Sequence, residues 1–279
     1  MQKVKNVHVI KADGRRERFQ PDKIINTCLR AGLERDQAEE VLKKVVKKAY
    51  DNISTQALYK IVLEELRATE PTSSYFYSMR DAIANLDSES FELYAKKILE
   101  AYGYECKWNV LIHGACVEHQ VDIIAEREHE IMLVECKRHY NPHRFSGLNV
   151  ALQVHARMED INDGFELKKN KIRFTNAWVF TNTKFSDHAI AYSQCKNMRM
   201  TGWKYPEKAS LEDMVNNKRL LPVTVLDMPA DAKRSLLAKR IITVQDFLAT
   251  SPTKLKSLTK MNDSAVRQLL TQAKNVAKM

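Results

Sequence analysis

Three residues of this 279-residue chain have types and spacing that could do chemistry together: Asp122, Glu135 and Lys137. They occur in two short apolar runs, Val121–Ala125 and Ile131–Cys136, which a charged stretch joins. Apolar runs rich in Val and Ile on both sides of a polar connection predict a β-hairpin. We therefore expect the two acids and the lysine to lie on paired strands.

A loop at residues 127–130 sets the pairing of this hairpin and places Asp122 directly opposite Glu135. Because side chains alternate between the two faces of a strand, Asp122, Glu135 and Lys137 share one face. The other face is apolar. It comprises Val121, Ile123, Ala125, Met132, Val134 and Cys136.

Two facing carboxylates need a compensating charge. Like charges opposite each other repel, and burying an unpaired ion costs several kcal/mol. A divalent cation such as Mg²⁺ or Mn²⁺, bound by the carboxylate oxygens, offsets this cost. It also lowers the pKa of a bound water and stabilises charge on a phosphate under attack. The alternative is a solvent-exposed Glu–Lys–Asp salt-bridge cluster, because Glu-x-Lys alone is common on exposed strands.

Composition argues against several classes of protein. No stretch approaches about 18 consecutive apolar residues, so we expect no membrane-spanning helix. The N-terminus has no apolar core followed by a small-residue cleavage site, so we expect no secretory signal. The five cysteines are scattered without a C-x-x-C pair, which predicts reduced thiols, no zinc site and a cytoplasmic protein.

The net charge of +10 is concentrated near the end of the chain. Residues 1–87 hold 16 Lys and Arg against 13 Asp and Glu (+3), and residues 88–215 hold 17 against 18 (−1). Residues 216–279 hold 12 against 4 (+8). Concentrated basic charge attracts polyanions, of which nucleic acid is the commonest in the cytoplasm. The alternative is a solvated basic face without a ligand.

Residues 1–86 predict a β-hairpin followed by helices. Two β-like runs flank Asp13-Gly14, a tight-turn dipeptide. Ser54 is a good N-cap for a helix, and Pro71 is expected to interrupt the helical pattern. The β-like runs cover 7–11 and 16–19, and the helical patterns cover 22–31, 36–50, 54–68 and 73–85.

This segment resembles the ATP-cone, a small nucleotide-sensing module of ribonucleotide reductases and their regulators. The match covers VHVIKADGRRERFQPDKI, ISTQALYKIVLEEL and YFYSMR. The resemblance implies that ATP or dATP lies over the hairpin with basic side chains at its phosphates. The alternative is a degenerate cone kept only for dimerisation. The candidate nucleotide-binding residues are Lys11 and Lys23 at the family's basic positions, Gln20 and Ser54 at polar positions, and Arg15 and Arg16 from the basic cluster around the hairpin.

Residues 87–215 alternate helical and strand patterns, which predicts a mixed sheet flanked by helices. The chain here resembles the Mrr-type group of PD-(D/E)xK restriction endonucleases. The resemblance rests on FELYAKKILEAYGYE, QVDIIAEREHEIMLVECKR and AWVFTNTKFSDHAIAYS, in the family's order. Besides the hairpin, the expected helices cover 88–101, 147–161 and 187–200, and the expected strands cover 104–112 and 176–181.

The resemblance implies a metal site and a catalytic lysine. Asp122 and Glu135 match the metal ligands, with the backbone carbonyl of Cys136 contributing. Lys137 matches the catalytic lysine, which orients the attacking water or stabilises charge on the phosphate.

The resemblance also implies two further participants. Glu92 matches an acidic residue on the first helix that supports the metal directly or through water, and its alternative is an ordinary surface Glu. Gln153 falls on the helix after the Glu-x-Lys strand, where related nucleases place a polar residue facing the site. His113, His139 and His155 lie near the motif, and we interpret them as packing or surface residues.

Residues 216–279 resemble the helix-hairpin-helix modules of DNA-repair and polymerase-associated proteins. Pro252 can begin a short helix with Ser251 as its N-cap, and Asn262 or Asp263 can cap the last helix. The family's hairpins hold a Gly-x-Gly turn at DNA phosphates, which this chain lacks. The basic charge favours a nucleic-acid role, and protein–protein contact is the alternative.

Together these features predict a multidomain α+β and α/β chain: an ATP-cone-like domain (1–86), a nuclease-like domain (87–215) and a small all-α basic domain (216–279). They predict a Mg²⁺- or Mn²⁺-dependent endodeoxyribonuclease that hydrolyses DNA under control of ATP or dATP. Cutting both strands needs two active sites, so we expect a homo-oligomer. The lack of a long apolar stretch predicts no membrane partner. The alternative is a catalytically inactive, nucleotide-responsive DNA-binding protein.

Overall fold

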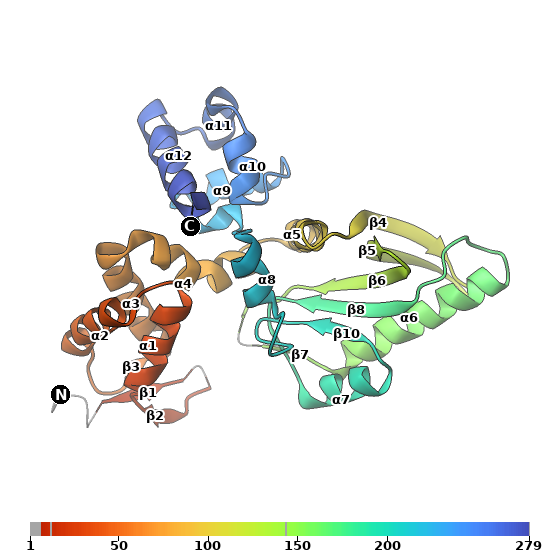
Figure 1. Ribbon diagram of the computed structural model, residues 1–279, viewed down its shortest axis with the longest axis horizontal. Helices are drawn as coiled ribbons and strands as arrows, with labels where there is room; N and C mark the ends of the chain where they lie inside the picture. Colours follow the sequence, from red (N-terminus) through yellow and green to blue (C-terminus); the bar gives the residue numbers. More distant parts are fainter. Residues whose placement is uncertain (1–6, 12, 143, 279) are drawn as a thin grey trace. The chain divides into compact units, whose positions relative to one another are not determined.

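The computed structural model describes residues 7–11, 13–142 and 144–278. The chain divides into two compact units, residues 1–79 and 80–279. The division falls within helix α4 (Pro71–Ala84), which is labelled in Figure 1. The three domains expected from the sequence, with ends at residues 86, 215 and 279, stay a prediction.

The first unit contains the predicted hairpin and three of the predicted helices. Strands β1 and β2 pair antiparallel, and Gly14 has a φ of +83° in their turn, which glycine adopts without steric cost. A third strand pairs parallel to β1, and the sheet order is β2–β1–β3. The elements are β1 (His8–Ile10), β2 (Arg16–Arg18), α1 (Pro21–Arg30), α2 (Arg35–Lys48), β3 (Ile53–Ser54) and α3 (Thr55–Thr69).

Two local features differ from the sequence prediction. Strand β3 was not predicted, because a strand of two residues has no alternating pattern to detect. Pro71 was expected to precede a helix that begins at residue 73, whereas it is itself the first residue of α4. Proline is tolerated there because the first helical position needs no backbone N–H donor. The predicted cap at Ser54 is confirmed, since its Oγ accepts the backbone N–H of Ala57 at 3.1 Å.

The second unit is built on a five-stranded mixed sheet with the order β10–β8–β6–β5–β4. Strands β4, β5 and β6 pair antiparallel, whereas β6, β8 and β10 pair parallel. A small parallel pair, β7 with β9, lies outside this sheet. The strands are β4 (Glu105–His113), β5 (Glu118–Arg127), β6 (Glu130–Lys137), β7 (Phe145–Ser146), β8 (Asn176–Thr181), β9 (Lys184–Phe185) and β10 (Arg199–Thr201).

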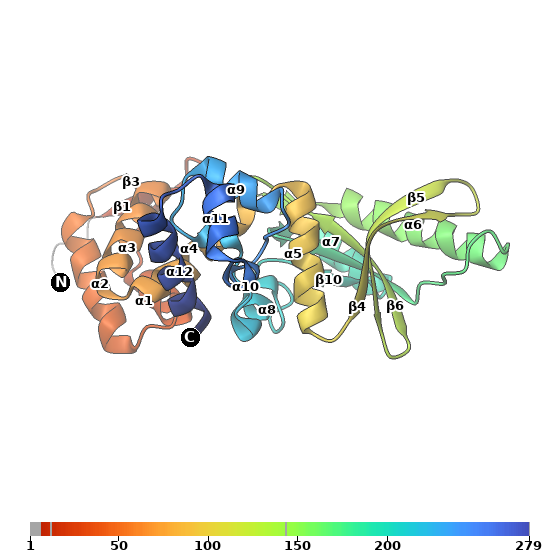
Figure 2. The same cartoon turned by 90° about the horizontal axis from the view of Figure 1, so that it is seen from above.

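Helices cover both faces of this sheet (Figures 1 and 2). On one face, α6 (Leu148–Glu166) and α7 (Asp187–Cys195) contribute Val154 and Ala189 to a core cluster with residues of β5, β6 and β8. On the other face, α5 (Ser88–Ala101) places Phe91 against Phe180 of β8, with ring centroids 6.4 Å apart. The predicted combination of a mixed central sheet with flanking helices is therefore confirmed.

The helix predicted over residues 187–200 is too long. Helix α7 ends at Cys195, and residues 199–201 form β10 instead. Asn197 has a φ of +53°, a left-handed conformation that ends the helical path. In the other direction, α6 continues to Glu166, five residues beyond the predicted end.

The last segment of the second unit is helical and contacts α5 of the same unit. The hydroxyl of Tyr94 on α5 donates to the carbonyl of Leu220 at 2.6 Å. Lys97 forms a 2.8 Å ion pair with Asp246. The elements are α8 (Leu211–Lys218), the 3₁₀ helix η2 (Val223–Val225), α9 (Ala230–Leu237), α10 (Val244–Ala249), α11 (Pro252–Thr259) and α12 (Asp263–Lys278).

Two predicted caps in this segment are confirmed. Ser251 accepts the backbone N–H of Lys254 at 3.4 Å, directly before Pro252 in the first turn of α11. Asn262 accepts the backbone N–H of Ala265 at 2.9 Å at the start of α12. Within the described part of the chain, no helix is both long and apolar enough to cross a membrane.

Candidate active site

The β5–β6 hairpin has the register predicted from the sequence. The last pair of its ladder is Ile123 with Val134. The next position of this register brings Asp122 opposite Glu135. The ladder itself ends before this pair, so the facing position of the two acids stays a prediction, although the charge of Glu135 acts on Asp122.

Asp122 lies where the sheet ladder breaks on both sides. Its Oδ2 accepts the backbone N–H of Cys136 at 2.8 Å, so a side chain occupies the place of a strand–strand hydrogen bond. On the opposite side, the pairing of β5 with β4 passes over Asp122 and Asn109, and Asn109 has a φ of +54°. A left-handed residue in a strand breaks the pleat locally.

The expected assignment of residues to the two faces of the hairpin is wrong for Val121. Val121 packs in the same core cluster as Ile124 and Leu133, on the face that α6 covers. Strict alternation from Ile124 predicts the opposite face for Val121. The pleat therefore changes phase between these residues, at Asp122.

The environment of Asp122 favours its neutral form. Burial and the nearby carboxylate of Glu135 raise the pKa of Asp122 to about 7. The hydrogen bond from Cys136 and the charge of Arg157 lower this pKa, and Glu92 raises it further. A positive charge bound nearby would lower the pKa of this carboxyl group and favour its ionised form.

Glu92 brings a third carboxylate from α5. Its Oε2 accepts the indole N–H of Trp108 at 3.0 Å. Burial raises the pKa of Glu92 against that hydrogen bond, and the charge of Glu135 raises it further. Glu92 thus interacts electrostatically with both Asp122 and Glu135, and its role with a metal stays a prediction.

Arg157 on α6 pairs with one of these acids, Glu135, and it was not among the residues predicted from the sequence. Its Nη1 forms an ion pair with Oε2 of Glu135 and lies 3.4 Å from the carbonyl of Gln120. The available signal was spacing, because Arg157 follows Gln153 by four residues and thus shares its helix face. Gln153 itself is exposed on α6, and no hydrogen bond joins it to the three acids in the described structure.

Lys137 ends β6 with an exposed side chain and an anchored backbone. Its carbonyl accepts the hydroxyl of Thr181 at 2.6 Å. Thr181 belongs to a buried hydroxyl cluster with Ser146 and Thr183. The strand end is therefore fixed while the ammonium group stays accessible to a ligand.

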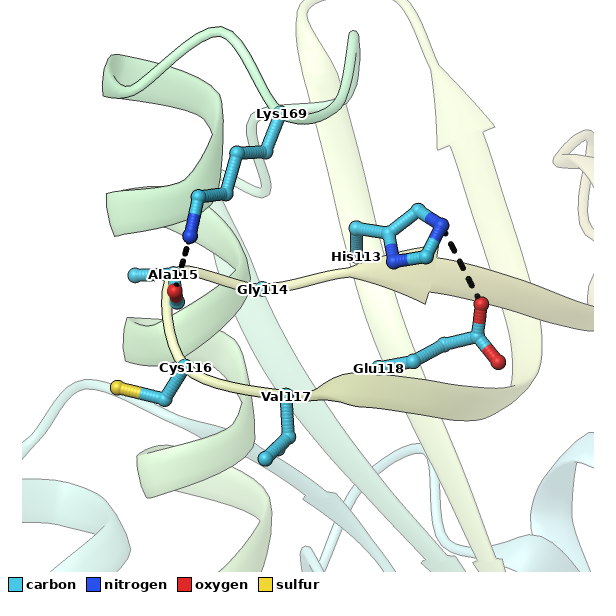
Figure 3. A pocket seen from close by; sticks show the side chains of 7 residues that line it. All are labelled: His113, Gly114, Ala115, Cys116, Val117, Glu118 and Lys169. Atoms are coloured by element: carbon cyan, nitrogen blue, oxygen red, sulfur yellow. Dashed lines mark hydrogen bonds and ion pairs between the residues drawn. The ribbon is translucent and has the colours of Figure 1, made fainter.

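The histidines near the motif have protein partners. Burial lowers the pKa of His139, whose Nε2 lies 3.0 Å from Oγ of Ser146. The ring of His155 packs against Tyr192. His113 lies at the tip of the β4–β5 hairpin, 3.4 Å from Glu118 (Figure 3).

That hairpin tip borders an open cavity of about 360 Å³. Figure 3 shows Lys169 reaching over it to donate to the carbonyl of Ala115. None of the predicted metal or catalytic residues lines this cavity.

The acids around Asp122 fit a divalent cation by charge, although their side chains do not converge. Among the described residues, no three His, Cys, Asp or Glu side chains form a ready set of metal ligands. Each of the three carboxylates accepts a protein donor instead. One guanidinium pairs with Glu135 alone, and a hard cation with oxygen ligands would favour the charged forms of all three acids.

The predicted nucleotide-binding residues lie around the β1–β2 hairpin of the first unit. Lys11 and Lys23 both approach the carboxylate of Glu17, at 3.3 and 3.7 Å. Arg16, on the opposite face of β2 from Glu17, forms a 3.1 Å ion pair with Asp51. The two lysines therefore lie close together at Glu17, whereas Arg16 lies at Asp51 and apart from them.

The remaining candidates of this set have local partners or are exposed. Arg15 pairs with Asp13 at 2.7 Å within the hairpin turn. Ser54 uses its hydroxyl as the cap of α3. Gln20 is exposed at the N-cap position of α1 and makes no capping hydrogen bond there.

Comparison with known families identifies the two parts of the chain. The ATP cone domain matches residues 7–85, and a restriction endonuclease domain of the Mrr type matches residues 83–204. An ATP cone domain is thus followed in this chain by an Mrr-type restriction endonuclease domain.

The chain is also similar to a curated protein and to a solved structure. An uncharacterized protein of Archaeoglobus fulgidus is 34% identical over 180 residues, which are 64% of this chain and 98% of that protein. The crystal structure of a protein of unknown function is 32% identical with a TM-score of 0.58. That match covers 69% of this chain and 99% of the other.

Proposed function

We propose that this protein is a divalent-metal-dependent endodeoxyribonuclease whose cutting responds to ATP or dATP. The observation that carries the proposal is the position of Asp122 at the break of the sheet. There, the carboxyl group of Asp122 has a raised pKa and interacts electrostatically with Glu135 and Glu92. The exposed Lys137 follows two residues after Glu135 on the same strand.

Each residue of this group has a role in the proposed hydrolysis. Asp122 and Glu135, with the carbonyl of Cys136, would hold Mg²⁺ or Mn²⁺, and Glu92 would support it directly or through water. Such a cation, when bound, supplies Lewis acidity and lowers the pKa of a coordinated water. Lys137 would direct its ammonium group at the phosphate and stabilise the negative charge that develops as the bond to the leaving oxygen breaks.

The parts outside this site would hold DNA and control cutting. Helices α11 and α12 and the turn after α9 carry exposed basic residues such as Lys254, Lys274 and Lys239, and phosphate attraction needs only such charges. The ATP cone would bind ATP or dATP near Lys11 and Lys23. Two copies of the chain would supply the two active sites that a double-strand cut requires.

The test is a plasmid-cutting assay with Mg²⁺ or Mn²⁺, with and without ATP or dATP. Wild type should cut, while Glu135→Ala and Lys137→Ala should lose cutting at least about 100-fold, as expected for groups that stabilise the transition state. Glu128→Ala, an exposed acid in the β5–β6 turn, is the matched control and should cut normally. Equal cutting by all four proteins would indicate a contaminating nuclease and defeat the proposal.

A second function is favoured by one observation, the engagement of Glu135 by Arg157. A catalytically inactive, nucleotide-responsive DNA-binding protein would keep such an ion pair permanently. In that case DNA binding would persist without cutting in either metal, on methylated or unmethylated plasmid.

A further inference from the structure

The chain from the end of β6 into β7 forms a loop with an exposed tip, directly after Lys137. We call its described residues, 139–142 and 144–146, the aromatic loop. Its two ends are joined, because Nε2 of His139 lies 3.0 Å from Oγ of Ser146. The side chain of Asn182 accepts the backbone N–H of His139 and donates to its carbonyl, both at 2.8 Å. The base of the loop is therefore fixed beside Lys137, whose carbonyl contacts the hydroxyl cluster that includes Ser146.

Two large aromatic side chains of this loop face solvent. Tyr140 is 75% exposed and Phe145 is 59% exposed. The guanidinium of Arg138 lies 5.6 Å from the centroid of the Tyr140 ring, which leaves most of that ring uncovered. Both aromatic residues directly adjoin the joined ends of the loop, so they lie within one small surface. Exposed rings that gather in this way are typical of a binding surface.

Positive charge gathers around the same loop. Burial lowers the pKa of His139, and three cations lower it further. They are Lys137, Arg144 and Arg138, so all three lie near the base of the loop. In the described part of the chain, no ion pair joins any of them to an Asp or Glu, and Arg138 donates to the carbonyl of Ala84 instead.

The local sequence has the same bias. Residues 136–158 hold four Lys and Arg and neither Asp nor Glu, whereas residues 88–215 as a whole have a net charge of −1. The aromatic loop therefore combines open rings with cations that lack acidic partners. A polyanion with planar apolar groups is the ligand that complements both.

We propose that the aromatic loop contacts duplex DNA at the base step beside the phosphate that Lys137 meets. Tyr140 and Phe145 lie against the bases, and Arg144 lies at the backbone. The position relative to Lys137 rests on the proposed nuclease function, in which this lysine acts at the scissile phosphate.

DNA fits this surface better than other partners do. Every base has a π face for an aromatic ring, and apolar side chains that enter a base step unstack it. An apolar protein surface would cover the rings and leave the cations unpaired. An acidic peptide would pair the cations and leave the rings in water.

Contacts of this kind should favour DNA whose stacking is already weakened. Entering an intact base step costs stacking energy, and the cost is least at a mismatched or unpaired base. We therefore expect the protein to bind a duplex with one mismatch more tightly than the same duplex fully paired.

The test is binding of the full-length chain to these two fluorescent duplexes in EDTA, measured by anisotropy. EDTA prevents metal-dependent cutting, so binding is read independently of nuclease activity. Tyr140→Ala and Phe145→Ala should each weaken binding to the mismatched duplex roughly 10-fold, as expected for the loss of one base–aromatic contact. The preference for the mismatched duplex should fall in both variants.

Three further variants separate the contributions. Tyr140→Phe should keep most of the affinity, because the ring remains. Arg144→Gln should lower the slope of log affinity against log salt by about 0.9, the value for one phosphate contact. Tyr50→Ala is the matched control, since Tyr50 is 58% exposed in the first unit, and it should bind as wild type does. Unchanged unfolding temperatures would establish that the variants are folded.

Wild-type affinity for both duplexes in Tyr140→Ala and Phe145→Ala would overturn the proposal, and so would a lack of DNA binding by wild type. Sedimentation velocity of the same variants tests the remaining occupant. A changed oligomeric state with unchanged DNA affinity would assign the rings to a contact between copies of the chain and overturn the proposal as well. A loss of binding in these variants of a protein that cuts no plasmid would support the DNA surface and defeat the nuclease activity alone.

Discussion

The guanidinium of Arg157 on α6 pairs with the carboxylate of Glu135 on β6, in a region that holds two further acids, Glu92 and Asp122. The exposed fractions of the paired side chains are 25% for Arg157 and 19% for Glu135. A pair shielded to this degree is costly to break from one side, because the remaining charge stays partly buried without a partner. The guanidinium of Arg157 thus offsets part of the negative charge at Glu135 that a bound metal ion would also offset.

Replacing this cation should destabilise the fold. We expect Arg157→Gln to lower the free energy of unfolding by about 1–3 kcal/mol near neutral pH, because Glu135 loses its ion-pair partner and Asp122 loses a nearby positive charge. The measurement is urea unfolding, with Arg173→Gln as control. Arg173 pairs with Glu166 in solvent, so its loss should cost less than about 0.5 kcal/mol. Millimolar Mg²⁺ should restore Arg157→Gln and leave the control unchanged; equal losses without a metal effect would contradict this account.

Asp122 should make the folded state less stable as the pH rises, whereas a carboxylate in an ion pair makes it more stable as the pH rises. Its pKa is about 7 in the folded chain against an ordinary value of 3.8, so the folded state holds the proton more tightly than the unfolded state. The stabilisation is complete below about pH 4 and is lost as the pH rises to about 7, at up to roughly 1.4 kcal/mol per pH unit.

Asp122→Asn removes this titration and is the reference for the measurement. The free energy of unfolding of wild type minus that of the variant should therefore fall between about pH 4 and pH 7 and level off above. A difference that rises over this interval would show that the Asp122 carboxylate is stabilised rather than destabilised by its surroundings.

The lysines at Glu17 should govern nucleotide affinity in the first unit. We expect Lys23→Ala to weaken ATP binding roughly 10-fold in calorimetry, because a phosphate loses a charge-assisted contact. Glu17→Gln should strengthen binding, since it removes a carboxylate that competes with phosphate for Lys11 and Lys23. Lys60→Ala, an exposed lysine on α3, is the control. Identical affinities for all variants would place the nucleotide elsewhere.

The basic C-terminal helices should set the salt dependence of DNA binding. Each lost phosphate contact lowers the slope of log affinity against log salt by about 0.9, so Lys254→Gln with Lys260→Gln should lower it by about 2. The matched control is Lys43→Gln with Lys47→Gln, two exposed lysines on α2. The measurement is fluorescence anisotropy at several salt concentrations. A slope that changes only in the control would move the DNA surface to the first unit.

Local pattern was sufficient for the elements that carry the acids. The connection between β5 and β6 is short, and it fixed a register in which Ile123 pairs with Val134 and Asp122 comes next. Side chains that cap their own helix, such as Ser54 and Asn262, were also predictable, because their hydrogen bonds span three residues. Features of this kind depend on neighbours in the chain.

Tertiary structure decided what surrounds the acids. The break at Asp122 coincides with the left-handed Asn109 of β4, and no pattern within β5 reveals the change of face at Val121. The guanidinium of Arg157 pairs with Glu135. The four-residue spacing of Arg157 from Gln153 predicts that they share a helix face, but it does not predict which residues pack against that face.

The sequence by itself therefore determined which residues could do chemistry: two acids held opposite each other by a tight hairpin, and a lysine beside them on the same strand. Only the tertiary structure decided their ionisation and their partners. The reason is physical, because pairing within a hairpin is a short-range property of the backbone. Burial and Coulomb interactions at Asp122 arise from segments that folding brings together, Glu92 on α5 and Arg157 on α6 among them.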